Sequence, residues 1–105
     1  MGIVVIVAYK PKPGKAEQLK EVTKTHVPRL KAEGLVTDRE PVILEAKDGT
    51  IVEVFEWLSE EAIQQAHQNA AVHQMWAEYG EVCDYLPLSS LPEASELFAS
   101  FKPVN

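Results

Sequence analysis

Apolar residues recur along this chain with two different periods, and the changes between them divide it into strands and helices. The segments 3–9 and 50–58 are dense in β-branched and aromatic residues, which predicts two strands. Between residues 15 and 33 apolar positions recur every three to five residues, which predicts an amphipathic helix ending at Gly34, with a kink near Pro28. Ser59 followed by Glu60 and Glu61 predicts the start of a second helical region that runs to about residue 82.

The remaining segments complete the predicted order. Residues 35–46 are extended but contain Pro41, which favours an edge strand or a bulge. Asp48 and Gly49 predict a type I′ hairpin turn into the strand 50–58, and Asn69 is a candidate second helix cap. Residues 83–91 are a fourth strand candidate. The order β-α-β-β-α-β predicts an α+β, ferredoxin-like domain with one antiparallel sheet and both helices on one face. We expect a single domain over residues 1–105, with a core at about 3–90 and a tail at 91–105, in a short helix or a further extended piece.

Both faces of the predicted sheet are apolar, although two helices can cover only one. In the first strand, Val5 alternates with Val4 and Ile6, so neither side is polar. In the third strand Val54 lies on the face opposite Phe55. The simplest solution is a second copy of the chain packed on the open face, and the sequence therefore predicts a homodimer in which a charge at Val5 or Val54 would be disruptive.

Composition excludes several classes of function. The chain has 105 residues, 46% hydrophobic and 25% charged, as expected for one globular domain. A formal net charge of −6, with only ten Lys and Arg, argues against a nucleic-acid partner. The longest apolar run is too short to span a membrane, and no secretory leader is recognisable, so we expect cytoplasmic residence. Cys83 is the only cysteine, which excludes an internal disulfide and favours a small buried side chain over a nucleophile.

Four stretches carry a resemblance to a known family. They are "AYKPKPGKAEQL", "THVPRLKAEG", "EVFEWLSEEAIQQAH" and "HQNAAVHQMW". Over about residues 3–90 the chain resembles the antibiotic biosynthesis monooxygenase-like domains of the dimeric α/β-barrel superfamily. This resemblance implies a ferredoxin-like homodimer and an activity needing neither metal nor flavin. The haem-degrading members are similar to one another in a first-strand Asn and a late helical His. Here the first strand has no Asn and the late position is Trp76, which disfavours haem degradation.

The histidines of "AHQNAAVHQMW" are candidates for metal ligands or for a catalytic group. A spacing of six residues puts His67 and His73 about 240° apart around a regular helix, which disfavours a shared metal, and no third ligand is at a recognisable spacing. His67 is either a partly buried structural histidine at the Asn69 break or a cavity-facing catalytic base, a role that the resemblance favours. His73 lies one turn before Trp76, beside an apolar stripe that packing alone also explains.

A small-molecule pocket is predicted between helices and sheet. Its candidate binding residues are His26, Trp57, His73, Trp76 and Tyr79, around His67 as the catalytic group. The predicted ligand is a small aromatic or enolisable metabolite, deprotonated by a histidine without a cofactor, so that its anion reacts with oxygen or rearranges. The alternative is a non-catalytic binding or structural dimer in which these residues are core.

Overall fold

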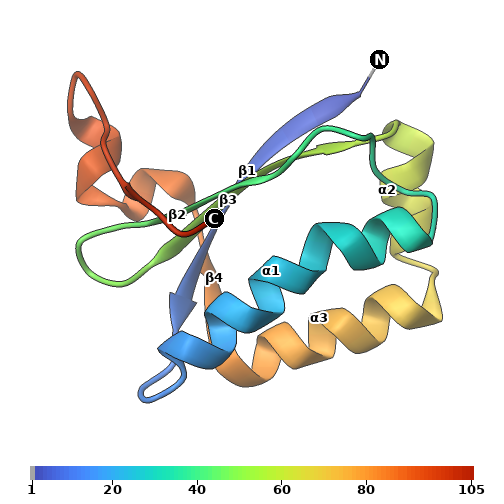
Figure 1. Ribbon diagram of the computed structural model, residues 1–105, viewed down its shortest axis with the longest axis horizontal. Coiled ribbons are helices and arrows are strands. Elements are labelled where there is room, and N and C mark those ends of the chain that lie inside the picture. Colours follow the sequence, from blue (N-terminus) through green and yellow to red (C-terminus); the bar gives the residue numbers. More distant parts are fainter. Residues whose placement is uncertain (1) are drawn as a thin grey trace.

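The computed structural model describes residues 2–105 and shows one five-stranded antiparallel sheet with its helices on one face (Figure 1). The strand order is β4-β1-β3-β2-β5. The elements are β1 (Ile3–Pro11), α1 (Ala16–Ala32), β2 (Val42–Glu45), β3 (Ile51–Trp57), α2 (Glu60–Ala66), α3 (Ala70–Val82), β4 (Cys83–Leu86), the 3-10 turns Leu88–Ser90 and Pro92–Ser95, and β5 (Lys102–Pro103). This arrangement confirms the α+β class with one antiparallel sheet and is consistent with a ferredoxin-like fold.

Helix caps determine the division of the second helical region into α2 and α3. The Ser59 hydroxyl accepts a hydrogen bond from the Ala62 amide at 3.1 Å, which starts α2. The Asn69 side chain accepts from the Val72 amide at 3.1 Å and starts α3. Both caps were predicted, because Ser and Asn satisfy backbone N–H groups that a helix start leaves free. The second helical region is therefore divided in two at Asn69, the second helix cap that the sequence offered, and the structure adds the strand β5 to the predicted order.

Two local predictions need correction. The Asp48–Gly49 hairpin is present, but its turn is not type I′, since Gly49 has φ +91° and no described non-glycine residue has a positive φ. The Gly49 amide instead bonds the Ala46 carbonyl at 3.0 Å, closing a longer loop. Pro28 lies inside α1, as predicted, and the helix continues past it to Ala32. β2 begins after Pro41 and is not an edge strand, because β5 pairs with its outer side.

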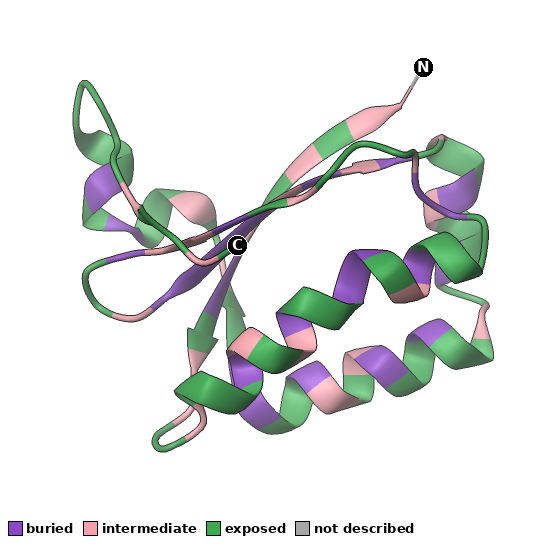
Figure 2. Cartoon of the chain, viewed as in Figure 1, coloured by how far each residue is buried: buried purple, intermediate pink, exposed green. Residues whose placement is uncertain are grey.

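Strand register assigns each side chain of the sheet to the helix face or the opposite face. Val5 pairs with Phe55, and Tyr9 pairs with Ile51, and these four residues belong to the core beneath the helices. Ala8 pairs with Val52 on the opposite side. Figure 2 shows the buried residues concentrated where the sheet meets α1 and α3. Val5 therefore points toward the helices, and only Val54 of the two predicted interface probes lies on the open face.

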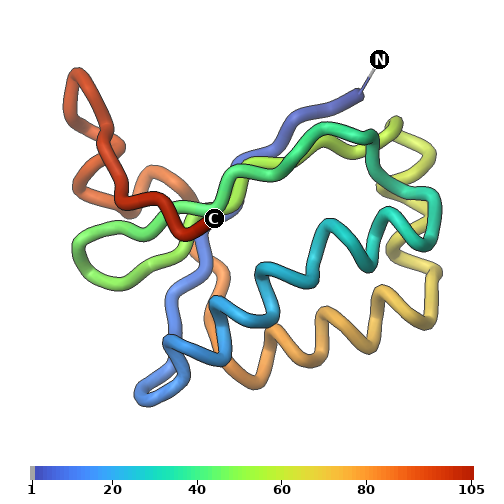
Figure 3. Tube along the Cα trace, in the orientation of Figure 1, coloured from blue at the N-terminus to red at the C-terminus, as the bar shows by residue number. Residues whose placement is uncertain are grey.

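The open face of the sheet is covered over only half of its length by the chain's own tail. Ala8, Ala46 and Val52 pack with Leu91 near the β2–β3 hairpin. Figure 3 shows this tail on the side of the sheet opposite α1 and α3. The other half carries four apolar side chains that we call the bare face, and three of them are about half exposed: Val4, Ile6, Val42 and Val54. No helix of the described residues is long and apolar enough to cross a membrane.

Candidate functional site

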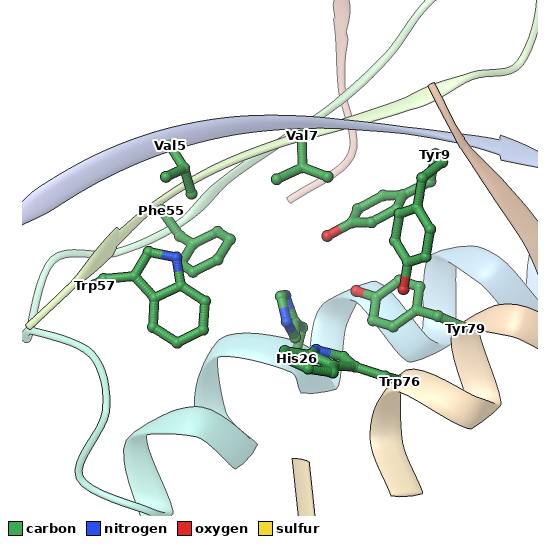
Figure 4. Close-up of a pocket in the computed structure, with 9 residues that line it drawn as sticks. Val5, Val7, Tyr9, His26, Phe55, Trp57, Trp76 and Tyr79 are labelled. Carbon is green, nitrogen blue, oxygen red and sulfur yellow. The ribbon is translucent and has the colours of Figure 1, made fainter. Parts of the chain in front are cut away.

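A cavity of about 420 Å³ lies between β1, β3 and the helices (Figure 4). Its wall is almost entirely apolar or aromatic. The lining residues are Val5, Val7, Tyr9, His26, Phe55, Trp57, Trp76, Tyr79 and Tyr85. They come from elements far apart in the sequence, which the sheet register brings together. Tyr85, at 54% exposure, is the most exposed of the lining residues.

A buried carboxylate organises the polar end of this cavity. Glu53 lies on the helix side of β3 and is fully buried. Its Oε1 accepts the Tyr9 hydroxyl at 2.7 Å and lies 2.7 Å from His26 Nδ1. The contact fits an Nδ1–H group that donates to Oε1, a tautomer that leaves Nε2 as an acceptor, while Glu53 Oε2 is buried without a partner among the described residues. Glu53 thus sets the orientation and tautomer of His26, which is itself a lining residue of the cavity.

Two tyrosines stack beside this network and are held in their neutral form. The rings of Tyr9 and Tyr79 have centroids 4.7 Å apart and an interplanar angle of 25°. Burial, and secondly the charge of Glu53, raise the pKa of both phenols well above the ordinary value. Burial also raises the pKa of Tyr85, to about 12. The Tyr79 hydroxyl is buried and has no hydrogen-bond partner among the described residues, although the residue itself lines the cavity.

The cavity lacks the positive charge that an anion-binding site needs. None of its lining residues is Lys or Arg, and His26, its only basic group, is already engaged by Glu53. A carboxylate or phosphate ligand would lose its hydration there without gaining a partner charge. A neutral aromatic molecule with one hydroxyl loses far less, and its hydroxyl can bond His26, which lines the cavity. The site is therefore suited to neutral, planar ligands.

The structure brings four of the sequence-predicted site residues to this cavity: His26, Trp57, Trp76 and Tyr79. It does not bring the other two. His67 is exposed, and its Nδ1 lies 2.8 Å from the Ile63 carbonyl oxygen, so the expected inward turn of its ring is absent. His73 is also exposed, and its Nε2 contacts the His67 carbonyl. His67 packs edge-on against Trp76 with ring centroids 5.1 Å apart, which leaves it behind the cavity wall.

Sequence reasoning overlooked Glu53, although a signal for it was present. In β3 the alternation of Ile51, Glu53, Phe55 and Trp57 puts these side chains on one face, and the other three are core residues. A carboxylate at a core-facing position needs a buried partner. That requirement points to His26 and Tyr9, the groups that the structure places against it. Cys83, by contrast, is buried as predicted, and burial raises the pKa of its thiol to about 11.

Among the described residues no group of three or more His, Cys, Asp or Glu side chains is placed to hold a metal ion. Comparison of the chain with models of known families, with curated proteins and with solved structures gives no match. The class of protein is therefore defined by the fold and the cavity themselves. It is an α+β domain whose helices and sheet enclose an aromatic pocket with one buried Glu–His pair.

Proposed function

We propose that this protein binds a small, neutral aromatic or enolisable metabolite in the cavity and acts on it without a cofactor. The observation that carries the proposal is the His26–Glu53–Tyr9 network at the wall of an otherwise apolar pocket. His26 is a lining residue held by a carboxylate, which is the arrangement of an oriented general base. The proposed base is thus His26 in place of His67, with Trp57 and Trp76 as walls.

The proposed chemistry begins with a proton transfer. His26 Nε2 takes the proton of a phenolic or enolic hydroxyl, and the Glu53 carboxylate stabilises the imidazolium that forms. The ligand anion then reacts with oxygen or rearranges, as the resemblance to antibiotic biosynthesis monooxygenase-like domains implies. Saturable binding without turnover of any bound phenol would instead assign a binding role.

Intrinsic fluorescence tests the pocket, because the chain's two tryptophans, Trp57 and Trp76, both line it. We expect saturable quenching by a neutral phenol such as 4-ethylphenol. The double substitution Val5→Phe and Val7→Phe fills the cavity and should weaken this quenching at least tenfold. His67→Ala is the matched control and should bind as the wild type does. If His67→Ala lost binding while the Val5→Phe, Val7→Phe variant bound as the wild type does, the ligand site would lie at His67 and not in this cavity.

We also propose that the protein is a homodimer through the bare face. Sedimentation at micromolar concentration should give about twice 11.7 kDa. Ile6→Lys places a charge in the middle of the proposed interface, and an unpaired buried charge costs several kcal/mol, so dimer dissociation should become at least a hundredfold more favourable. Ala71→Lys, on the exposed surface of α3, is the control and should leave the dimer intact. A wild-type monomer at these concentrations would contradict the proposal.

A further inference from the structure

The tail carries two adjacent apolar side chains that nothing in the described chain covers. Leu97 is 92% exposed and Phe98 is 83% exposed. They lie in a loop that projects from the sheet between the second 3-10 turn and β5, and we call residues 96–100 the arm (Figure 1). Scattered single exposed apolar residues are ordinary in proteins. Two consecutive ones with almost their whole surface in water, at the tip of a projecting loop, indicate a contact with another surface.

The bare face is the complementary feature on the same side of the sheet. The tail forms an extra layer on the half of the sheet next to the β2–β3 hairpin, where Leu91 packs on Ala8 and Val52. Over the other half the row Ile6, Val54 and Val42 has no such cover. Each chain therefore has a raised half with an apolar tip and a low half whose floor is apolar apart from Glu56, which lies opposite Val4 and pairs with Arg39. A twofold interface requires such self-complementarity, because each surface meets the other twice.

The exposed apolar area matches the need of a stable dimer. Val4, Ile6 and Val42 are 51%, 51% and 46% exposed, and Leu97 and Phe98 are nearly fully exposed. At about 150–250 Å² for a large side chain, these five offer on the order of 500 Å². A standard interface takes about 800 Å² from each partner, of which somewhat more than half is apolar. Without the arm, the bare face supplies only about half of the apolar area that a standard interface takes from each partner.

We infer that the arm of each chain packs on the bare face of a second copy, with Leu97 and Phe98 against Val4 and Ile6 of that copy. This inference rests on the proposed dimer and specifies its geometry. The twofold axis then runs across the strands, so that the hairpin half of one sheet faces the bare half of the other. An axis parallel to the strands would instead bring bare face against bare face and leave both arms in solvent.

Cross-linking distinguishes these two geometries. Phe98→Cys and Val4→Cys proteins are mixed and oxidised with oxidised glutathione, and the products are separated without reductant. We expect a covalent two-chain species from the mixture and little from either variant alone. The wild type is the control, since its Cys83 is buried. A two-chain species from Val4→Cys alone, or none in the mixture, would overturn the inference.

A second measurement separates failure of the arm from failure of the dimer. The double substitution Leu97→Ser and Phe98→Ser should raise the dimer dissociation constant at least tenfold in sedimentation, with the far-UV circular dichroism spectrum unchanged. Ala77→Ser, on the exposed surface of α3, is the control. If Ile6→Lys dissociates the dimer and the arm variant does not, the proposed arm contact is contradicted and the proposed dimer is retained. If neither variant changes the assembly, both are wrong.

Discussion

Glu53→Ala should destabilise the protein by about 2–6 kcal/mol, because it leaves two buried donors without an acceptor at about 1–3 kcal/mol each. The substitution deletes the acceptor of both the Tyr9 hydroxyl and His26 Nδ1, and both residues are at most 4% exposed. For a domain of about this size each kcal/mol lowers the melting temperature by about 4–8 °C. Urea unfolding at fixed protein concentration measures the change directly, because a dimer's stability depends on concentration.

Glu78→Ala is the matched control for this loss. Glu78 forms a surface pair with Arg29, at 2.8 Å and with both side chains more than a third exposed. Surface pairs contribute at most about 1 kcal/mol, so the control should unfold close to the wild type. Glu53→Gln keeps an acceptor oxygen at the same place, so its free energy of unfolding should lie between those of Glu53→Ala and Glu78→Ala. If Glu53→Ala were within 1 kcal/mol of the wild type, the network would not be the buried support that we describe.

Alkaline pH should unfold the protein through Tyr9 and Tyr79. Both are neutral when folded, since burial raises their pKa far above the ordinary value of about 10. The unfolded chain loses these two protons above pH 10 while the folded chain keeps them. The unfolded state then binds fewer protons, so stability falls as pH rises, by about 1.4 kcal/mol per pH unit for each tyrosine. The contribution is complete below pH 10 and is lost progressively above it.

Tyr79→Phe removes the contribution of one of the two tyrosines to the loss of stability at alkaline pH. The Tyr79 hydroxyl has no hydrogen-bond partner among residues 2–105, so its removal should leave stability at pH 7 unchanged or slightly higher. Above pH 10 the variant should lose about 1.4 kcal/mol less per pH unit than the wild type. Urea unfolding at pH 7, 10.5 and 11.5 makes the comparison. Parallel pH profiles for the two proteins would show that Tyr79 ionises normally in the folded state.

The elements of this fold were predictable because their signals are local. The Ser59 and Asn69 caps, the apolar alternation of β3 and the spacing of α1 all depend on residues a few positions apart. The Asp48–Gly49 turn type was not predictable, because the same dipeptide also fits a longer loop with only Gly49 in the left-handed conformation. The direction of Val5 required the register between β1 and β3, which no single strand specifies.

The candidate site was predictable only in part, and His67 shows why. The position of His67 at a helix break suggested that its ring turns into the cavity. In the structure its Nδ1 instead lies within hydrogen-bond distance of the Ile63 carbonyl, one turn earlier in the same helix. His26 comes to the cavity because α1 packs across β3, and this packing brings together residues 27 positions apart in the sequence. The acidic residue at a core-facing strand position was the one long-range signal present. It predicts that a buried partner exists without identifying it.

The central claim is that the cavity at His26 takes a neutral aromatic ligand. Titration calorimetry of the wild type at pH 7 with 4-ethylphenol and with 4-ethylbenzoate tests it most directly. The two probes have similar shape, but the phenol is neutral at this pH and the benzoate is an anion. We predict measurable binding of the phenol, with the benzoate at least tenfold weaker. Equal or tighter binding of the benzoate, or no binding of either probe at millimolar concentration, would contradict the claim.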